Sequence, residues 1–179
     1  AGHPLLLGLD GLADLGLIAA AAVAHPPALS QARADHPGAW AWKEPLLRQA
    51  FHAAAMRPEL QRELAAFRDR QRAWLDDWAL FAALKQAHGR RAWAEWPPDL
   101  RDRRDLDAAR REHAEAVAFH VFLQWLFERQ WSRFRAACHA RGVALLGDVP
   151  IFAAHDSADV WAHRELWKLD AAGRPTVVA

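Results

Sequence analysis

Apolar side chains recur at intervals of three and four residues over much of the chain, and this spacing limits what it can fold into. Such a pattern places the apolar side chains on one face of a helix. It predicts one helix from about Trp42, a second with Pro58 in its first turn, and a third from about Leu106 to Ala140. Gly89 and Gly142 are expected to end the second and third helices. The aromatic residues at helical spacing are predicted to lie in the core: Trp74, Trp78, Phe81, Phe119, Phe122 and Trp125.

Three stretches depart from this pattern. Residues 4–18 combine a short apolar run with turn formers, which predicts a strand or extended beginning followed by a small helical turn. Residues 25–38 collect prolines, a serine and a glycine, and this composition predicts a loop. Residues 93–98 end in two prolines, which remove two backbone donors and exclude helix at the preceding residue, so a connector is expected there.

The residues after Gly142 indicate a different kind of element. Val143–Leu146 is a short unbroken apolar run, typical of a parallel strand that is covered on both faces. A helix, a glycine and a buried strand form an α/β unit. In barrels of alternating strands and helices, residues at the C-terminal ends of the strands build the active site. Asp148, in the segment Gly147–Phe152, is therefore the best-placed acid in the chain.

Composition excludes several functional classes. The chain has 179 residues, of which 53% are hydrophobic, which is enough for one domain, or part of one, with a sizeable core. A formal net charge of +1 argues against nucleic acid as a partner. The single cysteine cannot form an internal disulfide and fits a reducing compartment, so a cytoplasmic location is expected. No run reaches the roughly 20 apolar residues of a membrane span, and the histidines lack zinc-ligand spacing.

Ten tryptophans and no tyrosine form an unusual balance. It indicates either a heavily aromatic core or a surface that stacks on flat ligands, of which sugars are one class.

Near the middle of the chain, charges of both signs alternate, which predicts a solvated, ion-paired face rather than a phosphate site. The residues concerned are Asp99, Arg101, Asp102, Arg103, Arg104 and Asp105.

Two motifs resemble a known enzyme family. Val117–Trp131 resembles the helix of bacterial amylomaltases in which phenylalanine, glutamine, an aromatic residue and a glutamine–tryptophan pair recur. Gly147–Phe152 resembles their barrel-strand signature and is followed by the similar segment His155–Trp161. Further matches near both ends and in between, among them Trp42–Lys43, Trp74–Leu75 and Trp96–Pro97, extend the resemblance over essentially the whole chain. On these residues the chain resembles the 4-alpha-glucanotransferases of the amylomaltase type, glycoside hydrolase family 77.

The resemblance implies an α/β fold, namely a partial (β/α)8 TIM barrel with a large inserted helical subdomain. Residues 1–42 would be a barrel segment with its loop, and residues 43–105 the inserted helical subdomain. Residues 106–179 would hold a long barrel helix, the strand with Gly147–Phe152 and the following loop. The resemblance also implies that the chain is an internal piece of a longer enzyme.

The implied activity is the transfer of α-1,4-glucan segments between maltodextrin or starch chains by a retaining double displacement. That chemistry needs two carboxyl groups about 5 Å apart, one as nucleophile and one as acid/base. In the family both lie on later strands, so no catalytic residue is expected in this chain, and the chain by itself is expected to be inactive. No metal or organic cofactor is required, and the expected partner is an α-1,4-glucan, with no nucleic acid and no membrane.

Two residues are expected to bind substrate by this resemblance. Asp148 would line the donor site next to the scissile bond as a hydrogen-bond acceptor; the alternative is a structural aspartate that caps the turn before Pro150. Trp40 would occupy an aromatic position, tyrosine in the family, that helps bind glucan at a secondary site. Asp156 or Ser157 is expected to cap a helix whose Trp161 packs inward. A non-catalytic glucan-binding or helical interaction module remains the alternative function.

Overall fold

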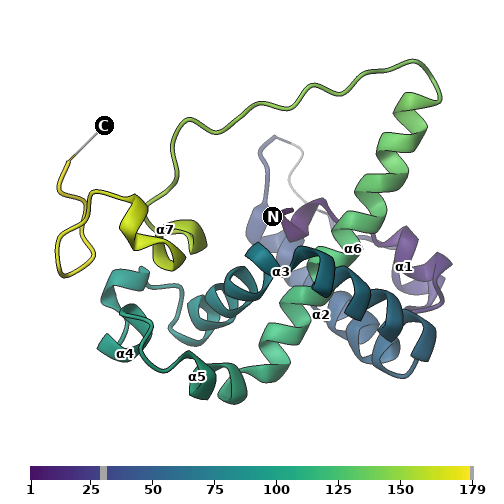
Figure 1. Ribbon diagram of the computed structural model, residues 1–179. Helices are drawn as coiled ribbons and strands as arrows, with labels where there is room; N and C mark the ends of the chain where they lie inside the picture. Colours follow the sequence, from purple (N-terminus) through teal and green to yellow (C-terminus); the bar gives the residue numbers. More distant parts are fainter. Residues whose placement is uncertain (29–31, 178–179) are drawn as a thin grey trace. The chain divides into compact units, whose positions relative to one another are not determined.

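The computed structural model describes residues 1–28 and 32–177, and this part of the chain is mostly helical (Figure 1). Its α-helices are α1 (Asp10–Asp14), α2 (His36–Ala55), α3 (Pro58–Ala87), α4 (Pro98–Arg101), α5 (Leu106–Glu112), α6 (Ala114–His139) and α7 (Ala158–Ala162). Short 3-10 turns precede, separate and follow these helices: η1 (Pro4–Leu6), η2 (Ala20–Ala22), η3 (Trp93–Glu95) and η4 (Arg164–Leu166). In the described ranges, β pairing is limited to one antiparallel bridge between Leu169 and Pro175.

The helix boundaries follow local signals in the sequence. The Asp35 side chain accepts a hydrogen bond of 2.9 Å from the Gly38 N–H, and this cap starts α2 at His36. The loop predicted over residues 25–38 is therefore wrong at its end, because Pro37 and Gly38 belong to the first turn of the helix; its residues 29–31 lie outside the described part. Pro58 begins α3, and Gly89 follows it with a positive φ of 62°, as expected.

The third predicted helix is two helices. Backbone dihedrals at His113 leave the helical region, with φ −105° and ψ 23°, and separate α5 from α6. The apolar spacing does not reveal this break, because buried Ala109 and buried Val117 are eight residues apart and would share one face of a continuous helix. Gly142 follows α6 with φ 69°, in agreement with its predicted role as terminator.

The chain divides into two compact units. Unit 1 comprises residues 1–71 and 122–145, and unit 2 comprises residues 72–121 and 146–179. Both α3 and α6 contribute residues to each unit. The domain limits expected at residues 42 and 105 concern the parent enzyme and stay a prediction.

In unit 1, side-chain amides and an ammonium group bind the N-terminal segment. Buried Gln124 accepts a hydrogen bond from the Gly2 N–H at 2.7 Å and donates one to the Gly2 carbonyl at 2.8 Å. Gln130 makes the same pair of bonds with Gly8, both at 2.8 Å. Lys43 Nζ donates to the carbonyls of residues 5 and 7 at 2.7 and 2.8 Å, and burial lowers the pKa of this ammonium. These bonds satisfy backbone groups that the short N-terminal turns leave unpaired.

In unit 2, a cluster of aromatic rings forms the core. The Phe81 ring lies 5.4 Å from that of Trp96 and 5.8 Å from that of Trp161, and the two indoles are also 5.8 Å apart. Of the predicted core aromatics, Phe81 and Phe119 are buried in unit 2 and Phe122 and Trp125 in unit 1, whereas Trp74 and Trp78 are half-buried. The prediction that these aromatics serve mainly as core residues is confirmed for four of the six.

The predicted strand at Val143–Leu146 is wrong. This run has no regular secondary structure and its side chains are exposed, with Leu146 at 99%. A strand is stabilised by hydrogen bonds to its neighbours and by layers on its faces, and no strand neighbours this run within the described residues. The helix-dominated character of the expected fold is confirmed, but the described residues do not form a barrel.

None of the helices in the described ranges is both long enough and apolar enough to cross a membrane.

Candidate substrate-binding site

Asp148 lies in an extended, exposed segment of unit 2 that runs from residue 147 to residue 152. Its Oδ1 accepts a hydrogen bond of 2.8 Å from the N–H of the next residue, Val149. One carboxylate oxygen is therefore hydrogen-bonded to the backbone of the adjacent residue. Its second oxygen stays available as an acceptor, because each carboxylate oxygen has its own lone pairs. Large apolar side chains follow in the same segment, and Ile151 is 89% exposed.

The chain that follows Asp148 is fixed by the buried indole of Trp93, the first residue of η3. Trp93 Nε1 donates to the His155 carbonyl at 2.7 Å, and the Trp93 backbone N–H donates to Asp156 Oδ1 at 3.2 Å. The other oxygen of Asp156 pairs with Lys85 Nζ at 2.6 Å. These contacts tie residues 155 and 156 to residues that precede them by more than 60 positions.

Gly173 packs closely against the Trp93 ring. The His155 Nε2 atom lies 2.6 Å from the Gly173 carbonyl oxygen, and since a carbonyl only accepts, the imidazole donates from Nε2. A Cβ atom on Gly173 would lie 2.5 Å from the Trp93 ring, and its φ of 79° is in the left-handed region. Glycine is required here both for the backbone conformation and for the close approach. We refer to Trp93, His155, Asp156 and Gly173 as the indole anchor.

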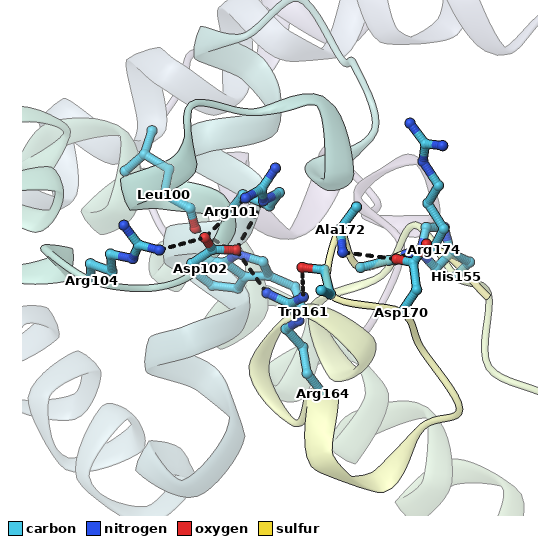
Figure 2. Close-up of polar contacts among 12 residues, drawn as sticks. Leu100, Arg101, Asp102, Arg104, His155, Trp161, Arg164, Asp170, Ala172 and Arg174 are labelled. Atoms are coloured by element: carbon cyan, nitrogen blue, oxygen red, sulfur yellow. Dashed lines mark hydrogen bonds and ion pairs between the residues drawn. The ribbon is translucent and has the colours of Figure 1, made fainter. Parts of the chain in front are cut away.

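The turn that carries Gly173 is held by Asp170. Its Oδ1 accepts from the N–H of Ala172 at 2.9 Å and from the N–H of Arg174 at 2.8 Å, as Figure 2 shows. The backbones of Asp170 and Arg174 are also joined, by an N–H to carbonyl bond of 2.8 Å. This small loop places the glycine against the indole without any strand pairing beyond the single bridge at its base.

Unit 2 also holds a carboxylate surrounded by guanidinium groups (Figure 2). Asp102 accepts from Arg101 and Arg164, each at 2.9 Å through its closest contact, and from Arg104 at 3.2 Å. The hydrogen bond from Arg101 is the main cause that holds the pKa of Asp102 well below its usual range, and Arg164 adds to it. The Arg164 guanidinium also lies 5.3 Å from the Trp93 ring centre. The ion-paired face predicted from charge alternation is confirmed, and it is only partly solvated.

Helix α7 begins and packs as the sequence predicts. Ser157 Oγ accepts from the Val160 N–H at 3.3 Å, so Ser157 is the N-cap, whereas Asp156 belongs to the indole anchor. Trp161 is fully buried, and its Nε1 donates to the Leu100 carbonyl at 2.9 Å. The Arg103 guanidinium lies 4.3 Å above the same ring. Residues 155–161 therefore have a structural role.

Trp40, the second residue expected to bind substrate, lies near the start of α2 in unit 1 and is half-buried. Asp148 belongs to unit 2, so the two residues lie in different units. Sequence analysis predicted a connector over residues 93–98 but gave neither Trp93 nor Gly173 a role in a site. In the described part of the chain, no three His, Cys, Asp or Glu side chains are grouped as metal ligands would be.

The indole anchor predicts a specific cost for a methyl group. Gly173→Ala is expected to destabilise the protein more than Gly142→Ala, by roughly 1–3 kcal/mol, because only residue 173 meets a buried ring. Both glycines have a positive φ, so the control carries the backbone strain of about 1–2 kcal/mol alone. Urea unfolding followed by circular dichroism measures the difference. Equal losses in the two variants would contradict the close packing at Gly173.

The guanidinium cluster predicts how stability changes in acid. In the unfolded chain Asp102 titrates near its ordinary pKa of 3.8, and in the folded chain its pKa is lower. Its stabilisation is therefore complete above the unfolded-state pKa and is lost as the pH falls toward the folded-state pKa. Asp102→Asn should lower the melting temperature at about pH 5 and reduce the further decrease between about pH 5 and pH 2.5. Asp99→Asn, at an exposed position of α4, should keep the wild-type pH dependence, and an identical profile for both variants would refute the assignment.

The chain is similar to a protein family, to individual relatives and to a solved structure. A family model described as 4-alpha-glucanotransferase matches residues 1–176. The 4-alpha-glucanotransferase of Thermus thermophilus is 47% identical over 183 residues, which cover 100% of this chain and 36% of that protein. The enzyme of the same name from Synechocystis is 38% identical over 172 residues, covering 94% of this chain and 34% of its own length. The solved structure of the amylomaltase from Streptococcus agalactiae in complex with acarbose matches with a TM-score of 0.92 and 28% identity, over 100% of this chain and 37% of that one.

The chain thus spans about a third of the length of the relatives it matches. The family match covers nearly all of its residues, and the structural match extends over its helices and its extended segment alike. On this evidence the chain belongs to the 4-alpha-glucanotransferase family.

Proposed function

We propose that the protein to which this segment belongs transfers α-1,4-glucan segments between maltodextrin or starch chains. The observation that carries the proposal is the 47% identity, over the whole chain, to a protein named 4-alpha-glucanotransferase. The amylomaltase with the same fold was solved in complex with acarbose, which supports a glucan as the bound substrate. The reaction would be a retaining double displacement, in which a sugar hydroxyl of an acceptor chain replaces water in the second step.

In this proposal the chain supplies part of the substrate cleft. Asp148 has one carboxylate oxygen committed to the Val149 N–H and one available for a hydroxyl group. A sugar hydroxyl donates readily to a carboxylate, and such a charge-assisted hydrogen bond is stronger than a neutral one. The exposed apolar side chains at Val149, Ile151 and Phe152 need a cover to be stable, which a neighbouring part of a barrel would provide.

The indole anchor gives Asp148 a fixed reference point in this proposal. His155 lies seven residues after Asp148 and is held through both its carbonyl and its imidazole. The segment between them can therefore shift only as far as a short tether allows. Substrate binding benefits from such support, because a carboxylate that is already positioned loses less entropy when the sugar binds.

Trp40 is proposed as a second contact with glucan, in unit 1. An indole offers a flat apolar face that packs against the apolar face of a glucose ring. Compared with the tyrosine that the resemblance implies for this position, the tryptophan keeps the stacking surface and lacks the hydroxyl. Its half-buried state leaves part of that face available. We expect the parent protein to be cytoplasmic and to need no metal or organic cofactor.

The first test concerns catalysis by this chain. The 179-residue chain is expected to release no glucose from maltotriose above a buffer control, because the nucleophile and the acid/base are expected on other strands of the enzyme. Coupled glucose detection over several hours measures it. Turnover that is abolished in Asp148→Asn would overturn this assignment and place a catalytic carboxylate at residue 148.

The second test separates glucan binding from a purely helical interaction module. Titration with maltoheptaose should shift the tryptophan fluorescence, and Trp40→Ala should remove most of that shift, because stacking on a sugar changes the surroundings of a half-buried indole. Trp167→Ala is the matched control, since Trp167 is also partly exposed but lies in unit 2. A shift that survives in Trp40→Ala, or no shift in the wild type, would contradict the proposed role of Trp40.

A further inference from the structure

Unit 1 contains a pocket of about 370 Å³ that is lined by residues of α3 and α6. Its volume is within the range of sites that bind small organic molecules. Buried Phe67 and buried Trp125 contribute the apolar part of the lining. The remaining residues of the lining are charged or polar, so the chemistry of the pocket is set by its charges.

Three guanidinium groups line this pocket, and only one of them is neutralised. Arg129 pairs with Glu63, and its guanidinium also lies 5.2 Å from the Trp125 ring centre. Arg70 and Arg133, by contrast, make no side-chain ion pair or hydrogen bond with any of the described residues. Arg129 and Arg133 are four residues apart on one helix, where like charges repel. An anion between the arginines would relieve this repulsion.

The charge and the size of the pocket narrow the class of anion. The lining holds three arginines and two glutamates, a net charge of +1, so it favours an anion, and Arg70 and Arg133 can each bind oxygens of a phosphate monoester. Guanidinium groups also fit phosphate oxygens with paired hydrogen bonds. Inorganic phosphate would leave much of the pocket unfilled. The pocket also holds Glu128 and Ser132, which disfavour a second phosphate group but can bind hydroxyl groups.

We propose that this pocket is a binding site for a hexose monophosphate, with the phosphate held by Arg70 and Arg133 and the sugar hydroxyls by Glu128 and Ser132. The apolar face of the sugar ring lies toward Phe67 and Trp125 in this arrangement. The proposal does not rest on glucan transfer, because it concerns an anion, and the proposed substrates of the transfer reaction are neutral.

Calorimetric titration of the 179-residue chain with glucose 6-phosphate tests the site. Saturable binding is expected in a buffer of low ionic strength, and each of Arg70→Gln and Arg133→Gln should weaken it roughly tenfold. Arg135→Gln is the matched control, because it removes the same charge from an exposed position of α6 outside the pocket. That variant should bind within about twofold of the wild type. All three arginines are exposed, so their substitution should leave the circular dichroism spectrum unchanged.

Two companion ligands decide which part of the molecule is recognised. Glucose should bind far more weakly than glucose 6-phosphate, and inorganic phosphate should bind more weakly than the sugar phosphate. Equal binding of glucose would overturn the assignment of the arginines, and equal binding of inorganic phosphate would overturn the assignment of Glu128 and Ser132. An absence of saturable binding by glucose 6-phosphate, or an equal loss in Arg135→Gln, would overturn the site as a whole. None of these outcomes depends on the maltotriose or maltoheptaose experiments.

Discussion

The buried indole of Trp93 is the contact on which the C-terminal part of unit 2 depends. Residues 147–156 contain no helix, and in the described ranges no sheet supports them. Both polar groups of Trp93, its backbone N–H and its ring N–H, are used to hold residues 155 and 156. Its ring faces are used as well, since the turn at Gly173 and the guanidinium of Arg164 pack against it. Few side chains can combine a large apolar surface with a hydrogen-bond donor in this way.

How much of the structure could be predicted from sequence follows from where each element obtains its hydrogen bonds. A helix satisfies its backbone internally, so the spacing of apolar residues together with Pro58, Gly89 and Ser157 was sufficient to indicate several boundaries, although the start of α2 at the Asp35 cap was missed. A parallel strand obtains its hydrogen bonds from neighbours that are distant in sequence. The run Val143–Leu146 has the composition of such a strand, yet composition cannot provide the neighbours. Because this run is exposed, its apolar composition indicates only that it could form a buried strand and does not show that neighbouring strands are present.

In the candidate site, too, local contacts could be predicted from sequence and long-range contacts could not. Residues that act through local bonds, such as Ser157 at the start of α7, were predictable because the partner is three positions away. The indole anchor was not, because the sequence distance from Trp93 to His155 is 62 residues and no local rule connects them. Asp148 lies between these cases. Its bond to Val149 is local and visible, whereas its expected contact with sugar depends on surroundings that a single segment does not determine.

Charge distribution separates structural from ligand-binding arginines in this chain. Around Asp102, three arginines share one carboxylate, and Arg103 pairs with Asp77 and lies over a buried ring, so each arginine of this cluster has a carboxylate partner within the protein. Between α3 and α6 the opposite holds, because Arg70 and Arg133 line a pocket without a carboxylate partner among the described residues. A guanidinium group without an ion-pair partner is well hydrated, so it costs the protein little stability. Two such groups that line the same pocket repel each other, and a bound anion reduces that repulsion. The sequence shows arginines in both places; only their partners distinguish a stabilising network from a site that can take up a ligand.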